Sequence, residues 1–221
     1  MNDLKLRQEV LKIGRLLHEK SLVAATDGNV SVRLDDGSIL VTPTCMCKGM
    51  MGLDDLTVVD PHGRKLDGWR EISSEIGMHL LIYRLRRDVH AVVHAHPPTA
   101  TGFAAAGLAL DEPLIAEVEL SAGGIPLARY ALPGSSELHA TLAPLVPGHN
   151  AILMSNHGVV TYAEDLLTAY MHMETVEHFA KICLVTRQLG QQHLLTAEQV
   201  EELHELKEKR LAALRPLLKK A

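Results

Sequence analysis

The sequence lacks the features that direct a protein into or across a membrane. No stretch approaches the roughly 18 consecutive apolar residues that a transmembrane helix needs. Residues 1–20 are amphipathic and carry more charges than a secretory signal peptide tolerates. An excess of positive charge is also missing, because the net charge is -5 and the charged residues are dispersed. We therefore expect a cytoplasmic protein that binds a small molecule and neither nucleic acid nor membranes.

Cysteine is scarce as well. The chain has three cysteines, an odd number in a sequence without an export signal, so free thiols are expected rather than a disulfide framework. Cys45 and Cys47 leave open the alternative of a metal-binding pair. With 221 residues, of which 47% are hydrophobic, the chain is long enough to bury a full core. We expect one domain that spans residues 1–221.

The spacing of apolar residues predicts alternating helices and short strands. Helices are expected at residues 3–20, 73–86, 99–106 and 164–189, and a capping box of Thr196 and Gln199 is expected to begin a last helix. Strands are expected at residues 30–33, 38–42, 56–59, 89–96, 151–154 and 159–161. Only short extended pieces are expected between 107 and 150. The first part of the chain is therefore rich in short strands.

Two histidines lie two residues apart in the strand expected at 89–96. Because side chains alternate along a strand, His94 and His96 emerge on the same face, where both imidazoles can bind one ion. A catalytic zinc site usually has three protein ligands, and His157 is the best third candidate because Gly158 permits a tight turn beside it. The spacing alone leaves open the alternative that these histidines are ordinary surface or packed residues.

Five short motifs occur together and in order along the chain. They are Gly28-Asn29-Val30-Ser31, Thr42-Pro43-Thr44, Ser73-Ser74-Glu75, His94-Ala95-His96-Pro97 and Asn156-His157-Gly158. This set, between roughly residues 3 and 190, resembles the class II aldolase/adducin family, and the ordered combination is far more specific than any one tripeptide. The resemblance implies an α/β fold, an α/β/α sandwich around a mainly antiparallel sheet. It also implies a homotetramer with active sites between neighbouring subunits.

The family's metal site can be carried over residue by residue. The resemblance assigns a divalent ion to His94, His96 and His157, with Glu75 as the fourth ligand and the catalytic base. Three histidines and a carboxylate suit Zn²⁺ best, with Mn²⁺, Co²⁺ or Ni²⁺ as alternatives. Without the resemblance, Glu75 is equally well interpreted as a carboxylate that stabilises the positive end of a helix.

The family binds the phosphate of its substrate with backbone and hydroxyl groups. The resemblance assigns this role to residues near three of the motifs, Gly28, Asn29, Thr44, Ser73 and Ser74. The alternative for the two serines is ordinary helix capping. The family's glycine after Thr44 is replaced by Cys45, whose side chain is expected to narrow the pocket, and Lys48 is a candidate for a compensating positive charge.

The proton donor for the leaving oxygen also departs from the family pattern. The L-fuculose-1-phosphate aldolases of this family use a tyrosine where this sequence has Glu117, and no tyrosine follows Tyr170. A glutamate at this place resembles the methylthioribulose-1-phosphate dehydratases, in which a carboxylate moves the proton. The alternative is that Glu117 and Glu119 are solvated charges on an edge strand.

The resemblance favours a metal-dependent aldolase, an aldehyde-lyase of carbohydrate metabolism that acts on a phosphorylated sugar. The expected reaction is retro-aldol cleavage of a ketose 1-phosphate to dihydroxyacetone phosphate and an aldehyde through a metal-bound enediolate. A dehydratase, and a 4-epimerase like those that act on L-ribulose 5-phosphate, are the alternatives. A weaker alternative is a metal-binding protein without catalysis, like the adducins.

Overall fold

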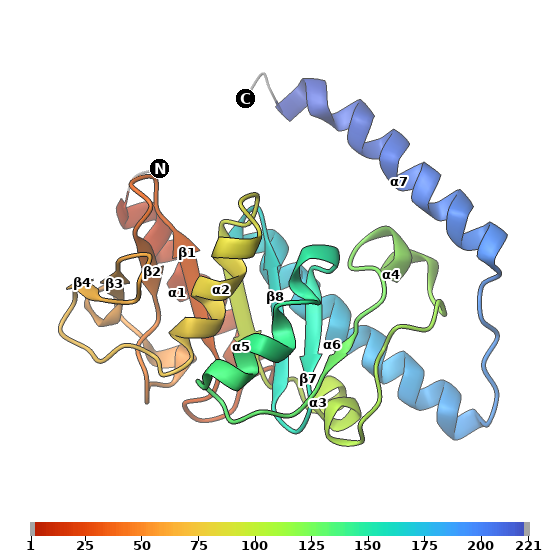
Figure 1. Ribbon diagram of the computed structural model, residues 1–221, viewed down its shortest axis with the longest axis horizontal. Coiled ribbons are helices and arrows are strands. Elements are labelled where there is room, and N and C mark those ends of the chain that lie inside the picture. Colours follow the sequence, from red (N-terminus) through yellow and green to blue (C-terminus); the bar gives the residue numbers. More distant parts are fainter. Residues whose placement is uncertain (1–2, 219–221) are drawn as a thin grey trace.

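Helices lie on both sides of one mixed sheet in the computed structural model, which describes residues 3–218 (Figure 1). The helices are α1 (Asp3–Glu19), α2 (Ile76–Leu85), α3 (Pro98–Ala105), α4 (Ala116–Leu120), α5 (Ser136–Leu142), α6 (Leu166–Leu189) and α7 (Ala197–Leu218). The strands are β1 (Asn29–Arg33), β2 (Ile39–Val41), β3 (Thr57–Val59), β4 (Lys65–Asp67), β5 (Ala91–Ala95), β6 (Leu127–Ala128), β7 (Ala151–Met154) and β8 (Gly158–Ala163). Three short 3-10 helices, Lys48–Met50, Leu53–Asp55 and Val146–Gly148, lie in the connections.

The strands form one sheet in the order β4-β3-β2-β1-β5-β8-β7-β6. All neighbouring strands are antiparallel except β6 and β7, which run parallel. In the centre of the sheet, His94 on β5 lies opposite Asn29 on β1 and opposite Val160 on β8. The predicted sandwich around a mainly antiparallel sheet is confirmed, and its register brings the histidine motif beside the Gly-Asn motif.

The alternation of side chains along β5 separates two apolar layers. Ala91, Val93 and Ala95 face the layer that contains α1, α3 and α6, whereas Val92 faces the layer that contains α2 and α5. All five residues of the strand are buried, as expected for a central strand covered on both sides. His94 shares the face of Val92, so its imidazole lies on the α2 side of the sheet.

The termini of the long helices follow the sequence signals closely. Gly190 ends α6 in the left-handed conformation with φ 76°, which glycine adopts without steric cost. Thr196 and Gln199 form the expected capping box, because each backbone N–H donates to the other residue's side chain at 3.3 Å or less. Within the described residues, none of the helices is long and apolar enough to cross a membrane.

Two expectations about the middle of the chain are wrong. The segment between 107 and 150 contains the helices α4 and α5, not only extended pieces, and Glu117 and Glu119 therefore lie on a helix rather than on an edge strand. The sequence gives only a weak helical pattern here, because α4 has only five residues and its position depends on contacts with α7. The helix expected from residue 73 begins at Ile76, and Glu75 rather than a serine is its N-cap residue.

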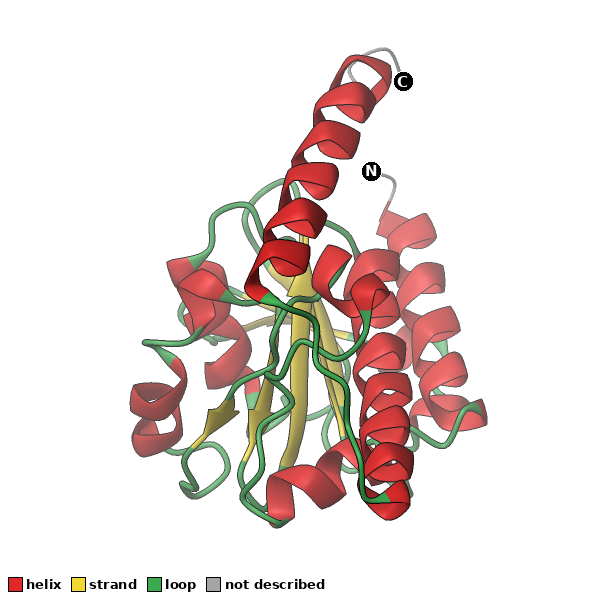
Figure 2. Ribbon diagram, turned by 90° about the vertical axis from the view of Figure 1, so that its right-hand side faces the viewer, coloured by secondary structure: helices red, strands yellow, loops and turns green. Residues whose placement is uncertain are grey.

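The last helix leaves the body of the molecule after its first turns (Figures 1 and 2). Its docked part is held by Lys207, whose ammonium donates to the backbone oxygen of Ser121 at 3.0 Å, just after α4. The chain before it is held by the Leu195 N–H, which donates to the oxygen of Pro113 at 2.8 Å. The α4 segment is thus positioned from α7, far along the chain.

Candidate metal centre

His94 is fixed at the end of β5 in a single orientation. Its side chain is completely buried, and Nδ1 lies 2.8 Å from the backbone oxygen of Val159 on the neighbouring strand. A carbonyl oxygen can only accept, so Nδ1 carries the hydrogen of the neutral imidazole. The lone pair of Nε2 is therefore free to bind a cation, as is usual for a metal-binding histidine.

Two loops bring the other histidines to the same place. His96 follows β5 and is held by its backbone N–H, which donates to the oxygen of Leu22 at 3.0 Å. His157 lies in the β7–β8 turn, where Asn156 adopts the left-handed conformation with φ 55°. Gly158 is required beside it, because a Cβ there would approach the His96 ring to 2.5 Å. The tight turn therefore allows the imidazoles of His96 and His157 to approach one another.

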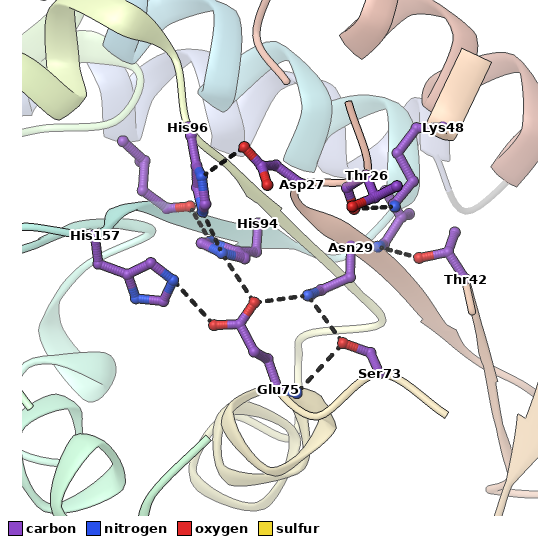
Figure 3. A network of polar contacts seen from close by, with 12 residues as sticks. Thr26, Asp27, Asn29, Thr42, Lys48, Ser73, Glu75, His94, His96 and His157 are labelled. Atoms are coloured by element: carbon purple, nitrogen blue, oxygen red, sulfur yellow. Dashed lines mark hydrogen bonds and ion pairs between the residues drawn. The ribbon is translucent and has the colours of Figure 1, made fainter. Parts of the chain in front are cut away.

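Glu75 closes the cluster from the N-terminal end of α2 (Figure 3). Its Oε2 lies 3.2 Å from Nε2 of His94, and its Oε1 lies 3.0 Å from Nε2 of His157. The carboxylate also accepts from Nδ2 of Asn29 at 3.1 Å. Ser73 supports this arrangement, since its Oγ accepts from Asn29 Nδ2 at 3.2 Å and from the Glu75 N–H at 3.3 Å.

The spacing of these atoms fits a divalent ion. Nε2 of His94 and Nε2 of His96 are 3.1 Å apart, and one ligand atom from each of the three histidines lies within 4.8 Å of the others. Tetrahedral zinc with bonds of about 2.0–2.1 Å separates its ligand atoms by about 3.3 Å. Because two nitrogen lone pairs at this distance repel one another unless a cation or proton lies between them, the donor set suits a metal ion.

The electrostatics of the cluster keep the ligands in their metal-binding forms. Burial alone would raise the pKa of Glu75, but the neighbouring His94 and His157 outweigh it and hold the pKa well below the usual range. Burial, and after it the electrostatic influence of His94 and His157, lowers the pKa of His96 to about 4. The carboxylate is therefore ionised and the His96 imidazole neutral at neutral pH, as metal binding requires.

A small cavity of about 150 Å³ adjoins the cluster. It is lined by Glu75, by His96 and by all five residues assigned to phosphate binding, which are Gly28, Asn29, Thr44, Ser73 and Ser74. Their neighbours Thr26, Asp27, Pro43 and Cys45 complete the lining. Gly28 has φ 70°, and a Cβ there would approach the backbone oxygen of His94 to 2.6 Å, so the strand and the turn pack together only with glycine. The structure thus brings the predicted metal and phosphate residues to one place.

The loop after Thr44 differs from a glycine loop in its backbone strain. Cys45 lines the cavity and has φ 54°, a conformation that favours glycine over residues with a side chain. Lys48 does not line the cavity. Its buried ammonium donates to the backbone oxygens of Thr26 at 3.0 Å and Met46 at 2.6 Å, and burial lowers its pKa. The expected compensating charge from Lys48 is therefore wrong, and the lysine instead fastens the loop to the Gly-Asn turn.

Glu117 lies apart from the metal cluster within one chain. It is exposed on α4 and lines a separate cavity of about 780 Å³ with residues of α6, among them Glu174 and Lys181. Its neighbour Glu119 is buried, with Oε2 4.0 Å from Nε2 of His204 on α7. The structure does not bring the two predicted catalytic carboxylates, Glu75 and Glu117, together in a single subunit.

Two polar residues near the cluster were not found from the sequence. Asp27 reaches the outer side of the cluster, with Oδ2 3.4 Å from Nδ1 of His96. His79 is completely buried one helical turn after Glu75, and burial lowers its pKa to about 3. The spacing of four residues between Glu75 and His79 was the available signal, because it places both on one face of a helix.

Comparison with known proteins identifies the family of the chain that forms this site. The sequence profile described as "Class II Aldolase and Adducin N-terminal domain" matches residues 8–184. The chain belongs to the class II aldolase/adducin family. It is similar to a 3-oxo-tetronate 4-phosphate decarboxylase of Pectobacterium atrosepticum, with 32% identity over 91% of this chain and 94% of that protein. It is equally similar to an L-fuculose phosphate aldolase of Methanococcus maripaludis, with 33% identity over 82% of this chain and 97% of that protein.

A solved structure of an L-fuculose 1-phosphate aldolase superposes on the chain with a TM-score of 0.86 and 32% identity, over 92% of this chain and 96% of that one. Aldolases and decarboxylases both break carbon–carbon bonds and are lyases. The prediction of a lyase is therefore confirmed. His94, His96 and His157 form a group able to hold the divalent metal that this family uses.

Proposed function

We propose that the protein cleaves a ketose 1-phosphate into dihydroxyacetone phosphate and an aldehyde in a metal-dependent retro-aldol reaction. The observation that carries this proposal is the Glu75 carboxylate, which adjoins three converging histidines and faces a cavity lined by hydroxyl and amide groups. Similarity to L-fuculose phosphate aldolase supports the same reaction class. The proposed substrate is a phosphorylated sugar.

The proposed ion is Zn²⁺, with Mn²⁺, Co²⁺ or Ni²⁺ as alternatives, held by His94, His96 and His157 with Glu75 as a fourth ligand. When bound, a divalent ion supplies Lewis-acid polarisation of a ketone oxygen. The donation from His94 Nδ1 to the Val159 oxygen at 2.8 Å holds the ring in the orientation that this requires.

Glu75 is the proposed catalytic base and acid. In the cleavage direction the C4 hydroxyl of the substrate loses its proton and the C3–C4 bond breaks, with its electron pair staying on C3. Glu75, after taking up a proton from water, delivers it to that carbon. Asn29 Nδ2 stabilises the ionised carboxylate from one side at 3.1 Å, and Ser73 holds the asparagine in turn at 3.2 Å. The other amide atom, Asn29 Oδ1, is buried without a partner in the described part of the chain and suits a substrate hydroxyl.

The proposed phosphate site is the cavity between the Gly28-Asn29 turn, Thr44 and the Ser73-Ser74 pair. Among the residues that the structure describes, no lysine or arginine lines this cavity, so hydroxyl groups and backbone N–H groups at the start of α2 would hold the anion. Cys45 narrows the same cavity, which favours a small anionic group such as phosphate over a bulkier substituent.

The proton of the C4 hydroxyl, which is lost as the aldehyde forms, needs a second group. We keep Glu117 as the proposed donor and acceptor, and it can serve only from a neighbouring subunit because it lies outside the cavity of its own chain. The proposal therefore includes a homotetramer with active sites at the subunit interfaces. A cytoplasmic location is proposed because the three cysteines Cys45, Cys47 and Cys183 are free thiols.

Decarboxylation is a second candidate function, favoured by the similarity to 3-oxo-tetronate 4-phosphate decarboxylases. In such a substrate the C1–C2 bond breaks, CO₂ leaves, and the electron pair stays on C2 beside the ketone. Glu75 again takes up a proton from water and delivers it to that carbon. Because no hydroxyl proton is lost when CO₂ departs, this reaction needs no second group to accept one, and the exposed position of Glu117 is then no obstacle.

Product analysis distinguishes the two functions. The Zn²⁺-loaded protein is incubated with a panel of ketose 1-phosphates and, separately, with 3-oxo-tetronate 4-phosphate, and dihydroxyacetone phosphate, aldehyde and CO₂ are measured. Dihydroxyacetone phosphate with an equal amount of aldehyde supports the aldolase, whereas dihydroxyacetone phosphate with CO₂ supports the decarboxylase. An enone or diketone product instead would contradict both and indicate a dehydratase.

A further inference from the structure

A row of polar contacts joins β1 to α2 directly behind Glu75. The side chains at alternate positions of β1 face those at every fourth position of α2. Two residues of a strand advance by about 6.7 Å and four residues of a helix by about 6.0 Å, so the two rows stay in step for three positions. We call this set the polar ladder. Its members are Asn29, Ser31 and Arg33 of β1, with His79 and Tyr83 of α2 and the N-cap residue Glu75.

Short hydrogen bonds connect the middle and far parts of the polar ladder. Ser31 Oγ lies 2.6 Å from Nδ1 of His79 and 2.8 Å from the hydroxyl of Tyr83. Arg33 donates from Nη2 to the backbone oxygen of Tyr83 at 2.6 Å, and its guanidinium lies 4.9 Å from the centre of the Tyr83 ring. Ser31, His79 and Tyr83 are all buried, so water does not compete for these bonds.

His79 is an unexpected residue for this environment. The layer around it is apolar, with Met78, Ile82 and Val92 among its buried members. One ring nitrogen meets Ser31, but the other, Nε2, is buried without a hydrogen-bond partner in the part of the chain that the structure describes. A buried polar atom without a partner lowers stability, and an apolar side chain of similar size would avoid this cost. The benefit of His79 must therefore lie outside the stability of the core.

The near end of the polar ladder is the metal cluster. Asn29 donates to Glu75, and Asn29 also lies opposite His94 in the β1–β5 register. One strand therefore positions a metal-binding histidine through its backbone and the catalytic carboxylate through the ladder. An axial slip of α2 along β1 would move Glu75 relative to His94, and misplacement of about 1 Å at a reacting group can reduce the rate about 100-fold.

We propose that His79 is a positioning residue for Glu75, which together with Ser31 and Tyr83 locks α2 in one axial register on β1. This inference rests on the proposed role of Glu75 but concerns the geometry behind it. The imidazole does not contact substrate in this role. It holds the helix so that the carboxylate meets the cluster at the observed distances.

The test compares His79→Phe, which keeps volume and removes the hydrogen bond, with Met78→Leu, a packing change in the same helix and layer that leaves the polar ladder intact. Each variant is loaded with Co²⁺, whose visible absorption reports the ligand geometry, and Tm, Co²⁺ affinity, kcat and KM are measured. For His79→Phe we expect an unchanged or higher Tm, an altered Co²⁺ spectrum, and a kcat about 10- to 100-fold lower with little change in KM. Met78→Leu should resemble the parent protein in all five measurements.

Two further variants keep the proposal testable if His79→Phe does not fold. Tyr83→Phe removes one hydroxyl from the polar ladder and should alter the Co²⁺ spectrum in the same direction to a smaller extent. His79→Gln keeps a group able to bond Ser31 and should recover part of the lost kcat. A Co²⁺ spectrum and affinity in the folded ladder variants equal to those of the parent would overturn the proposal. The Co²⁺ readout needs no turnover, so failure of the proposed reaction is recognised separately by absent products in the parent protein.

Discussion

The two carboxylates expected to move protons, Glu75 and Glu117, lie in contrasting surroundings. The Glu75 side chain is 13% exposed and lies within 3.2 Å of polar atoms from three other residues. Glu117 is exposed on a five-residue helix, and its carboxylate makes no hydrogen bond or ion pair with the described residues. The cluster around Glu75 is preorganised within one chain, whereas Glu117 has no fixed geometry there. Preorganisation is what makes a charged group effective in catalysis.

The difference follows from how each region is held. The neighbouring strands β1, β5 and β8, together with α2, position Glu75, His94 and His157. The register of the sheet fixes these three strands relative to one another. The α4 segment is instead held by a few contacts, such as the bond from Lys207 to the oxygen of Ser121. Sheet register is specified by the burial of one whole face, so a small change elsewhere does not shift it. The short helix has no such constraint.

The strongest way to break this contrast is to remove the innermost metal ligand. In His94→Ala we expect loss of bound metal and a decrease in turnover on the order of 1,000-fold or more, because several kcal/mol of transition-state stabilisation depend on the ion. Metal analysis of the purified variant and steady-state kinetics measure this. A folded variant that retains one metal ion per chain would contradict the ligand assignment.

A matched pair of substitutions compares the two carboxylates directly. Glu75→Gln should keep metal bound through the three histidines and reduce kcat by about 100- to 10,000-fold, the range that a general base contributes. Glu117→Gln should leave metal content unchanged. Its kcat should fall in aldol cleavage if the neighbouring subunit supplies this group, and should stay within about twofold of the parent in decarboxylation.

The values of kcat for Glu75→Gln and Glu117→Gln, measured with a ketose 1-phosphate and with 3-oxo-tetronate 4-phosphate, test this comparison. Equal effects of Glu117→Gln on the two reactions would contradict the idea that only aldol cleavage needs a second group for proton transfer. Full activity of Glu75→Gln would remove Glu75 from the mechanism altogether.

Much of this architecture follows from local patterns in the sequence. The two-residue spacing of His94 and His96 requires only an extended strand, and the left-handed Gly190 and the Thr196 capping box act within a few residues of themselves. These features were predictable because their physical causes are short-range. His157 was already a candidate because Gly158 follows it, but its assignment needed the family motif, because nothing local specifies that a turn between β7 and β8 meets the end of β5.

The features that were missed or wrong depend on distant contacts. Lys48 was expected in the cavity because a lysine usually reaches solvent or an anion, but two backbone oxygens hold its ammonium in the interior. The partners of His79 come from β1, 48 residues earlier in the chain, so its role is invisible until α2 packs on the sheet. The α4 helix is too short to show a period, and its position depends on α7.

Replacing the strained residue of the cavity loop is expected to have a smaller effect. Cys45→Gly relieves a left-handed conformation that costs a side-chain-bearing residue about 1–2 kcal/mol, and added freedom of the unfolded chain offsets about half of this. We expect Tm to rise by about 1–4 °C and the KM for the phosphorylated substrate to fall as the cavity widens. Cys47→Ala, outside the cavity lining, is the control. A lower Tm or a higher KM for Cys45→Gly would show that the thiol contributes contacts of its own.

The smallest expected effect is the pH dependence of stability that comes from His79. Burial holds its pKa in the folded protein at about 3, whereas an unfolded histidine titrates near 6.5. Between these values the unfolded chain binds the extra proton, so the free energy of unfolding decreases as the pH falls. Its neighbours in the fold are Ser31 and Tyr83, and the titratable groups of Glu75 and His94 lie nearby. His96 adds a decrease of the same sign.

The contribution of His79 can be isolated by comparing the parent protein with His79→Phe after removal of metal, because bound metal adds its own pH dependence. Between about pH 7 and pH 5.5, the parent should lose about 1 kcal/mol more of its unfolding free energy than the variant does. Urea unfolding at the two pH values measures the difference. Equal losses would mean that the buried imidazole already gains its proton in the folded state at pH 5.5, which requires a water or carboxylate partner at Nε2.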